Sequence, residues 1–224
     1  APFAAIADAV AIAAPGTTIT IHGGTYPESF YLRKGGQEGA PLVFRGVPGE
    51  RVVISGFQPV EGWQPLGDGR FTVTLDERIS DLFTGMRPCR VAREPDAEEA
   101  WIRITAYDPK TGRAKLEQLP EIPQEQQRNL VLLSFSNRSA VQQYTPIQSI
   151  DRAAAAVQLS GRVRMAAEDP AVLCNAEAFV DRPGEWSCQP TENGRYRVVF
   201  FPRQPADLER TQTRVRDTLF RVHN

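Results

Sequence analysis

The sequence is poor in the residues that most often hold metals or cofactors. Its 224 residues include two histidines and three cysteines, and the cysteines form no Cys-x-x-Cys pair. A structural zinc site is therefore not expected. The glycine-rich signatures of phosphate-binding loops, Gly-x-x-x-x-Gly-Lys-Ser/Thr and Gly-x-Gly-x-x-Gly, are also absent. We therefore expect no metal and no cofactor.

An excess of charge of one sign and long hydrophobic runs are missing as well. The 26 basic and 27 acidic residues give a net charge of −1, so no basic surface for nucleic acid is indicated. No apolar run approaches the roughly 18 residues that a membrane span needs, and no secretory signal is visible. We expect neither a nucleic-acid partner nor a membrane partner.

Turn-forming residues are plentiful. The chain has 18 prolines and 17 glycines, with 41% hydrophobic and 24% charged residues, which is typical of a globular protein with many turns. One helix is expected near the start, where apolar residues within the stretch 3–14 recur at helical spacing before Pro15 and Gly16 end it. The remainder reads as mostly β.

Short strand-like runs follow the expected helix at nearly regular spacing. Residues 18–21, 42–46 and 52–55 are rich in β-branched or other apolar residues, and glycine and proline separate them. This pattern is typical of a chain that winds through stacked coils of short strands. Later in the chain, Asn193 and Gly194 lie between two strand-like runs and predict a β-hairpin.

Motifs near both ends of the chain resemble those of a known group of proteins. Pro-Gly-Thr-Thr-Ile at residues 15–19 and Gly-Gly-Thr-Tyr-Pro-Glu at residues 23–28 resemble the N-terminal region of pectate-lyase-like right-handed parallel β-helix proteins. Asp-Arg-Pro-Gly-Glu-Trp at residues 181–186 resembles a signature of the β-helical glycoside hydrolases in which an antiparallel β domain interrupts the early coils. The middle of the chain matches this pattern more weakly.

The resemblance implies a mostly β fold in three parts. Residues 1–57 would form a capping helix and the first coils of a right-handed parallel β-helix. Residues 58–215 would form an inserted antiparallel β domain, and residues 216–224 a strand that re-enters the β-helix. Because a coil needs neighbours to bury its apolar face, we expect the chain to be the front of a longer polypeptide or to pair with a partner chain.

The function implied by the resemblance is that of the N-terminal portion of a secreted carbohydrate-active protein. A glycoside hydrolase acting on a polysaccharide is favoured over a polysaccharide lyase, with catalytic residues outside this chain. Two alternatives stay open, a non-catalytic surface or scaffold protein and a glycan-binding β domain, because fold alone does not fix function. Whether the chain is an enzyme is left open. Its expected location is secreted, periplasmic or at the cell surface.

Asp181, Glu185 and Trp186 are the candidate substrate-binding residues. Two carboxylates beside an aromatic ring suit a sugar site, and a carboxylate pair can act as acid and base on a glycosidic bond. The alternative is structural: the Pro-Gly pair forms a turn, the carboxylates accept backbone donors, and the indole ring is buried. The acidic run at residues 96–99 reads as an exposed turn rather than a calcium site.

Aromatic residues could also line a surface on which sugar rings stack, or they could fill the core of a small β domain. The six considered are Trp63, Trp101, Trp186, Tyr107, Tyr144 and Tyr196.

The cysteines give a separate prediction. Cys174 and Cys188 flank a turn-rich stretch and are candidates for a disulfide, with buried free thiols as the alternative. Cys89 lies in a cationic segment that would favour a thiolate. No signature of a catalytic cysteine surrounds it, so a nucleophilic role is not expected.

Overall fold

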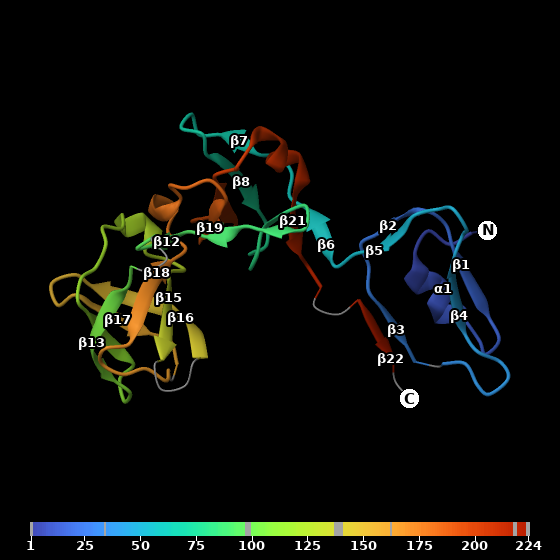
Figure 1. Ribbon diagram of the computed structural model, residues 1–224, viewed down its shortest axis with the longest axis horizontal. Coiled ribbons are helices and arrows are strands. Elements are labelled where there is room, and N and C mark those ends of the chain that lie inside the picture. Colours follow the sequence, from blue (N-terminus) through green and yellow to red (C-terminus); the bar gives the residue numbers. More distant parts are fainter. Residues whose placement is uncertain are drawn as a thin grey trace. The chain divides into compact units, whose positions relative to one another are not determined.

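The computed structural model describes residues 2–33, 35–96, 100–136, 141–161, 163–216 and 219–222. The chain divides into two compact units (Figure 1). One, here called the terminal unit, consists of Ala1–Val60 and Gln212–Asn224, and the other, the central unit, consists of Glu61–Thr211. Among the described residues, no helix has the length and apolar character that crossing a membrane requires.

The terminal unit begins with one short helix, α1 (Ile6–Ile12). The carboxylate of Glu28 accepts hydrogen bonds from the backbone nitrogens of Ile6 and Ala7, at 2.9 and 2.8 Å. These nitrogens belong to the first turn, whose donors have no partner within the helix. Glu28 therefore ties the start of α1 to the segment that precedes β3 (Phe30–Leu32).

Parallel strand pairs make up most of the terminal unit. Its strands, with β21 crossing its boundary, are β1 (Thr18–Ile21), β2 (Gly24–Tyr26), β3 (Phe30–Leu32), β4 (Val43–Gly46), β5 (Val52–Ile54), β6 (Phe57–Pro59), β21 (Thr211–Arg214) and β22 (Phe220–Val222). β1 pairs with β4, β2 with β5 and β3 with β22 in parallel, whereas β6 and β21 pair antiparallel. Ile19, Ile21 and Phe30 are buried and pack in one cluster with Ile6 of α1.

The central unit is built on a closed antiparallel barrel. Six strands form it: β13 (Ile102–Asp108), β14 (Arg113–Leu116), β15 (Val131–Ser136), β16 (Val141–Asp151), β17 (Ala156–Leu159) and β18 (Pro170–Cys174). The pairing runs β18–β13–β14–β17–β16–β15 and returns to β18, with every neighbouring pair antiparallel. Closure of this kind removes the unpaired edges that an open sheet exposes.

Aliphatic side chains fill the core of the barrel. The buried members contributed by its strands are Ile102, Ile104, Ala114, Leu116, Leu132, Ile147, Val157, Leu159, Ala171 and Leu173. Successive side chains of a strand point to opposite faces, and in β13 Ile102 and Ile104 are buried while Arg103 between them is exposed. Burying one large aliphatic side chain contributes roughly 1.5–3 kcal/mol, so this core accounts for much of the stability of the unit.

A second sheet in the central unit contains the Glu185–Trp186 segment. Its order is β11 (Arg90–Val91), β19 (Glu185–Pro190), β20 (Tyr196–Phe200), β8 (Phe71–Leu75) and β7 (Gln64–Pro65). β19 and β20 form an antiparallel hairpin whose turn contains Asn193 and Gly194, which confirms the hairpin predicted from the sequence. The remaining described elements are β9 (Phe83–Thr84), β10 (Arg87–Pro88), β12 (Arg93–Glu94), and the 3-10 helices η1 (Gln124–Gln126), η2 (Glu177–Phe179) and η3 (Pro205–Arg210).

The expectation of a right-handed parallel β-helix is wrong. Among the described residues, the parallel pairs of the terminal unit are each two-stranded, and the sheets of the central unit are antiparallel apart from the β11–β19 pair. The same finding overturns the resemblance to pectate-lyase-like proteins. Short β-rich runs separated by glycine and proline occur both in stacked coils and in antiparallel strands joined by turns, so the pattern did not distinguish the two.

Asn175 joins the barrel to the second sheet. It follows β18 in the left-handed backbone conformation, with a φ of 76°. Its Nδ2 donates to the carbonyl oxygens of Asn129 and Cys188 at 2.9 and 3.0 Å, and its Oδ1 accepts from the Cys188 nitrogen at 2.8 Å. The side chain of Gln189 donates to the carbonyl oxygen of Asn175 itself. Asparagine is one of the few residues that adopt this conformation readily, and here its side chain also satisfies buried backbone groups.

We expect Asn175→Ala to lower the free energy of unfolding by about 2–4 kcal/mol, because buried backbone groups lose their partners. Asn175→Gly removes the same hydrogen bonds but accepts the left-handed conformation, so its loss should be about 1 kcal/mol smaller. Urea denaturation of both variants measures the difference. Equal losses in the two variants would contradict the role assigned to the left-handed backbone conformation. If both variants were as stable as the wild type, the hydrogen bonds of Asn175 would not stabilise the contact between the barrel and the second sheet.

Candidate functional site

Three carboxylates meet beside the first residue of β19. Asp96 follows β12, Asp181 follows η2, and Glu185 begins β19. One oxygen from each side chain lies within 4.8 Å of the oxygens of the other two. Asp96 and Glu185 are buried, with 6% and 2% of their surface exposed, whereas Asp181 is exposed. These three residues are called the carboxylate cluster below.

A tight turn places Asp181 and Glu185 near one another. Gly184 adopts a φ of 96°, a conformation that glycine accepts without steric cost. The Arg182 nitrogen donates to Oε2 of Glu185 at 3.3 Å, and the Glu185 nitrogen donates to the carbonyl oxygen of Arg182 at 3.1 Å. Glu185 therefore has the structural role that was the alternative for this motif: its carboxylate accepts a backbone donor at a Pro-Gly turn.

Two guanidinium groups face the cluster. Nε of Arg90 lies 3.8 Å from Oε1 of Glu185, and Nε of Arg182 lies 3.1 Å from Oδ2 of Asp96. Arg90 also donates to the backbone carbonyl of Asp96 at 2.9 Å. Arg93 donates to the same carbonyl at 3.3 Å.

The protonation of the cluster follows from its burial. Burial, followed by the nearby charge of Asp96, raises the pKa of Glu185 from its ordinary value of 4.5 to about 8. Burial and then Asp96 also raise the pKa of Asp181. The pKa of Glu94 is raised mainly by burial, with Asp96 and Asp181 adding to the effect. At neutral pH, the carboxyl group of Glu185 is therefore mostly protonated.

This arrangement suits a bound proton on Glu185 better than a cation or a glycosidic acid–base pair. Carboxylate oxygens are the ligands that hard cations prefer, so Asp96, Asp181 and Glu185 could hold one. Such a cation would have to displace the proton of Glu185 and lie beside two guanidinium groups. Glycoside hydrolysis requires two carboxyl groups that both reach the scissile bond, and Glu185 has almost no exposed surface.

The structure separates Trp186 from the carboxylates with which the sequence grouped it. Successive side chains of β19 point to opposite faces, so Trp186 lies on the other side of the sheet from Glu185. Trp186 is 2% exposed and lines a cavity of about 380 Å³ together with Cys174 and Cys188. Of the three predicted site residues, Asp181 alone has an exposed side chain.

The predicted disulfide between Cys174 and Cys188 is not formed in the structure. Both residues are buried free thiols, which was the alternative reading. Burial raises the pKa of Cys174 to about 12, and it also raises the pKa of Cys188. Each thiol therefore remains protonated and packs as a small apolar side chain.

Sequence reasoning missed Asp96. It was read as part of an exposed acidic turn, but its side chain is buried against Arg182 and the rest of the cluster. Residues 97–99 of that run lie outside the described part of the chain. The residues that Asp96 meets in the cluster, Asp181, Arg182 and Glu185, are distant from it in sequence, so no local pattern could have predicted the contact.

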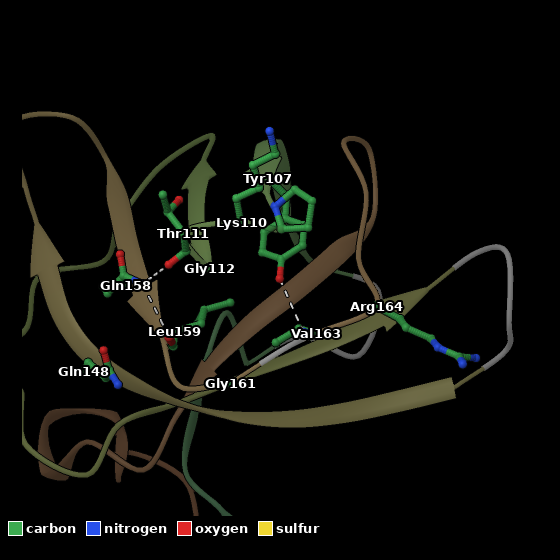
Figure 2. Close-up of a pocket in the computed structure, with 11 residues that line it drawn as sticks. Tyr107, Lys110, Thr111, Gly112, Gln148, Gln158, Leu159, Gly161, Val163 and Arg164 are labelled. Atoms are coloured by element: carbon green, nitrogen blue, oxygen red, sulfur yellow. Dashed lines mark hydrogen bonds between the residues drawn. The ribbon is translucent and has the colours of Figure 1, made fainter.

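A polar groove lies beside the turn between β13 and β14 (Figure 2). Its volume is about 1050 Å³. The residues that line this barrel groove are Tyr107, Pro109, Lys110, Thr111, Gly112, Gln148, Gln158, Leu159, Gly161, Val163 and Arg164. Tyr107 is one of the six aromatic residues considered from the sequence. The glutamines carried no sequence signal that could have placed them together.

Hydrogen bonds hold the frame of the barrel groove. Nε2 of Gln158 donates to the carbonyl oxygen of Thr111 at 2.5 Å, and the Tyr107 hydroxyl accepts from the Val163 nitrogen at 3.4 Å (Figure 2). Gln148, by contrast, has an exposed side chain. The described lining offers two amides, two hydroxyl groups, an aromatic ring and two cationic side chains, but no carboxylate. It can bind a polar molecule, and it lacks the acid–base pair that would hydrolyse one.

Comparison with known proteins places the fold but not the family. No protein-family model matches the chain. A stretch of 55 residues is 46% identical to "Uncharacterized protein YwoF" of Bacillus subtilis (strain 168), covering 25% of this chain and 12% of that protein. A solved structure titled "Glycoside hydrolase" matches with a TM-score of 0.70 and 19% identity, over 91% of this chain and 39% of the other.

A second solved structure, titled "The complex structure of XylC with xylose", aligns with a TM-score of 0.44 and 15% identity, over 98% of this chain and 29% of that one. A similarity that weak supports no conclusion. The first structure establishes a shared fold over most of this chain. In each of the three comparisons the chain spans well under half of the other protein.

The proton on Glu185 predicts how stability depends on pH. Because the folded state raises the pKa of this group from 4.5 to about 8, the folded state binds more protons than the unfolded state between these values. With respect to this group, the free energy of unfolding should be highest below about pH 4.5 and should fall by about 4 kcal/mol as the pH rises to 8.

Glu185→Gln keeps a neutral side chain at every pH and should flatten that decline, making the variant more stable than the wild type above pH 8. Urea denaturation from pH 5 to pH 9 measures the slope. Glu192→Gln, at an exposed glutamate in the hairpin turn, is the matched control and should keep the wild-type slope. A wild-type slope in Glu185→Gln would contradict the assignment of the proton.

Proposed function

We propose that this chain is part of a carbohydrate-active protein, in particular a glycoside hydrolase that acts on a polysaccharide, and that the chain contacts the glycan. The proposal places the catalytic residues outside this chain. The observation that supports it most directly is the fold shared over 91% of this chain with the protein titled "Glycoside hydrolase", at a TM-score of 0.70. The expected setting is a secreted, periplasmic or cell-surface protein.

The barrel groove is the surface that we assign to the glycan. An amide side chain both donates and accepts hydrogen bonds, so the exposed Gln148 can pair with neighbouring hydroxyl groups of a sugar ring. Nε2 of Gln158 already donates within the protein, and its Oε1 can accept from a further hydroxyl group. Tyr107 supplies an aromatic ring with a polar tip at the same place. The volume of about 1050 Å³ accommodates more than one sugar unit.

The carboxylate cluster has a lesser part in this proposal. Glu185 and Trp186 are too deeply buried to touch a saccharide, whereas Asp181 is exposed. Asp181 can therefore accept hydrogen bonds from a glycan, with Glu185 and Asp96 positioning the turn on which it lies. Catalysis by this cluster is not part of the proposal, because two carboxyl groups must reach the scissile bond.

The second candidate function is non-catalytic glycan binding by a surface or scaffold protein. The absence of a carboxylate pair among the described residues of the barrel groove favours it as an alternative. The two functions differ in turnover: a protein of either kind binds saccharide, but the hydrolase releases shorter products when the rest of its polypeptide is present.

We expect the chain to bind members of an oligosaccharide panel built from pentose, hexose and uronate units, as measured by isothermal titration calorimetry. Gln148→Ala should weaken binding about fivefold, the effect of losing one hydrogen bond worth about 1 kcal/mol. Gln142→Ala, an exposed glutamine of the same strand outside the groove, is the matched control and should bind as the wild type does.

Two results would contradict the proposal. Failure of the chain to bind any panel member would remove the glycan contact. Release of shorter products by the chain alone would place the catalytic residues within it.

A further inference from the structure

The cavity beside Trp186 differs in character from the barrel groove. It lies in the central unit, and its wall includes Val91 of β11, Val131 of β15 and Cys174 of β18. Its volume of about 380 Å³ is near the lower end of the range for small-molecule sites. Apolar side chains and buried thiols form most of this wall. An oligosaccharide, which is larger and covered with hydroxyl groups, does not fit such a site.

One side of the cavity is rigid. Asn175, which also lines it, is fixed by its hydrogen bonds to Asn129 and Cys188. Trp186 and Cys188 next to it are almost completely buried. A pocket whose walls are already in place does not have to be ordered by its ligand, and this favours binding.

A buried donor in this wall has no partner. Nε1 of Trp186 makes no hydrogen bond among the described residues, although the side chain is 98% buried. By comparison, Nε1 of Trp63 donates to the Thr211 hydroxyl at 2.8 Å. Nε1 of Trp186 is itself covered, with less than 1 Å² of accessible surface, so other atoms of the Trp186 ring form the cavity wall.

A positive charge lies at the same site. Arg78 lines the cavity and is exposed to solvent, so it stands where the cavity opens. Its charge opposes the rise that burial imposes on the pKa of Cys188, which indicates that its field reaches the thiol. The described lining contains no carboxylate that would neutralise Arg78.

We propose that this cavity is a binding site for a small aromatic monocarboxylate. The ring of the ligand occupies the apolar space between Val91, Val131 and Trp186, and its carboxylate pairs with Arg78. This site is independent of the glycan contact proposed above.

Nuclear magnetic resonance of the full chain labelled with 15N-tryptophan tests the proposal, with trans-cinnamate as the probe. The three tryptophans give three indole N–H signals, and Trp186→Phe identifies that of Trp186. We expect saturable movement of the Trp186 signal on addition of cinnamate. The signals of Trp63, whose donor is already paired, and Trp101, outside the cavity, should stay in place.

Two further variants test separately the charge of Arg78 and the space that the ligand ring would occupy. Arg78→Gln should weaken cinnamate binding about fivefold or more, the effect of one lost charge pair of about 1 kcal/mol. Arg87→Gln, at an exposed arginine outside the cavity, is its matched control and should leave binding unchanged. Val131→Phe fills the cavity and should abolish the movement while Trp186 itself is retained.

Three results would overturn the proposal. One is a Trp186 signal that stays fixed at millimolar cinnamate. Another is equal binding of cinnamate and the neutral cinnamamide, which would remove the role assigned to Arg78. The third is an unchanged response in folded Val131→Phe, which would place the ligand elsewhere.

Discussion

The central unit depends on the closure of its barrel through β18. This strand pairs with β13 on one side and β15 on the other, so its backbone groups are satisfied in both directions. Closure fixes where β18 ends, and the next residue, Asn175, is therefore held at one position relative to β19. The cavity beside Trp186 has one wall from the barrel and another from the second sheet, and it exists because that joint is fixed.

Local structure was predictable from the sequence where a short motif determines it. The helix signal ahead of Pro15 and the hairpin signal at Asn193 and Gly194 both correspond to observed elements. The barrel was not predictable in this way, because β18 must find two partners that are distant along the chain. Parallel coils and antiparallel strands have the same alternation of side chains, so hydrophobic pattern alone favoured the wrong sheet.

The site shows the same division between local and distant contacts. Asp181 and Glu185 are separated by one turn, and the sequence placed them together correctly. Trp186 follows Glu185 directly, yet its ring lies on the opposite face of the strand. The alternation of side chains along a strand could have predicted this separation from the sequence. Asp96 joins the cluster only through the tertiary fold. Burial, which decides whether these carboxylates are charged, is likewise a property of the fold and not of any motif.

The buried proton of Glu185 also has a calorimetric consequence. At neutral pH the unfolded chain holds this carboxyl group ionised, whereas the folded chain holds it protonated, so folding takes a proton from the solution. That proton comes from the buffer, and the heat of buffer ionisation becomes part of the measured folding enthalpy. Two buffers of different ionisation enthalpy would therefore report different heats for the same transition, and the difference between those heats counts the protons taken up.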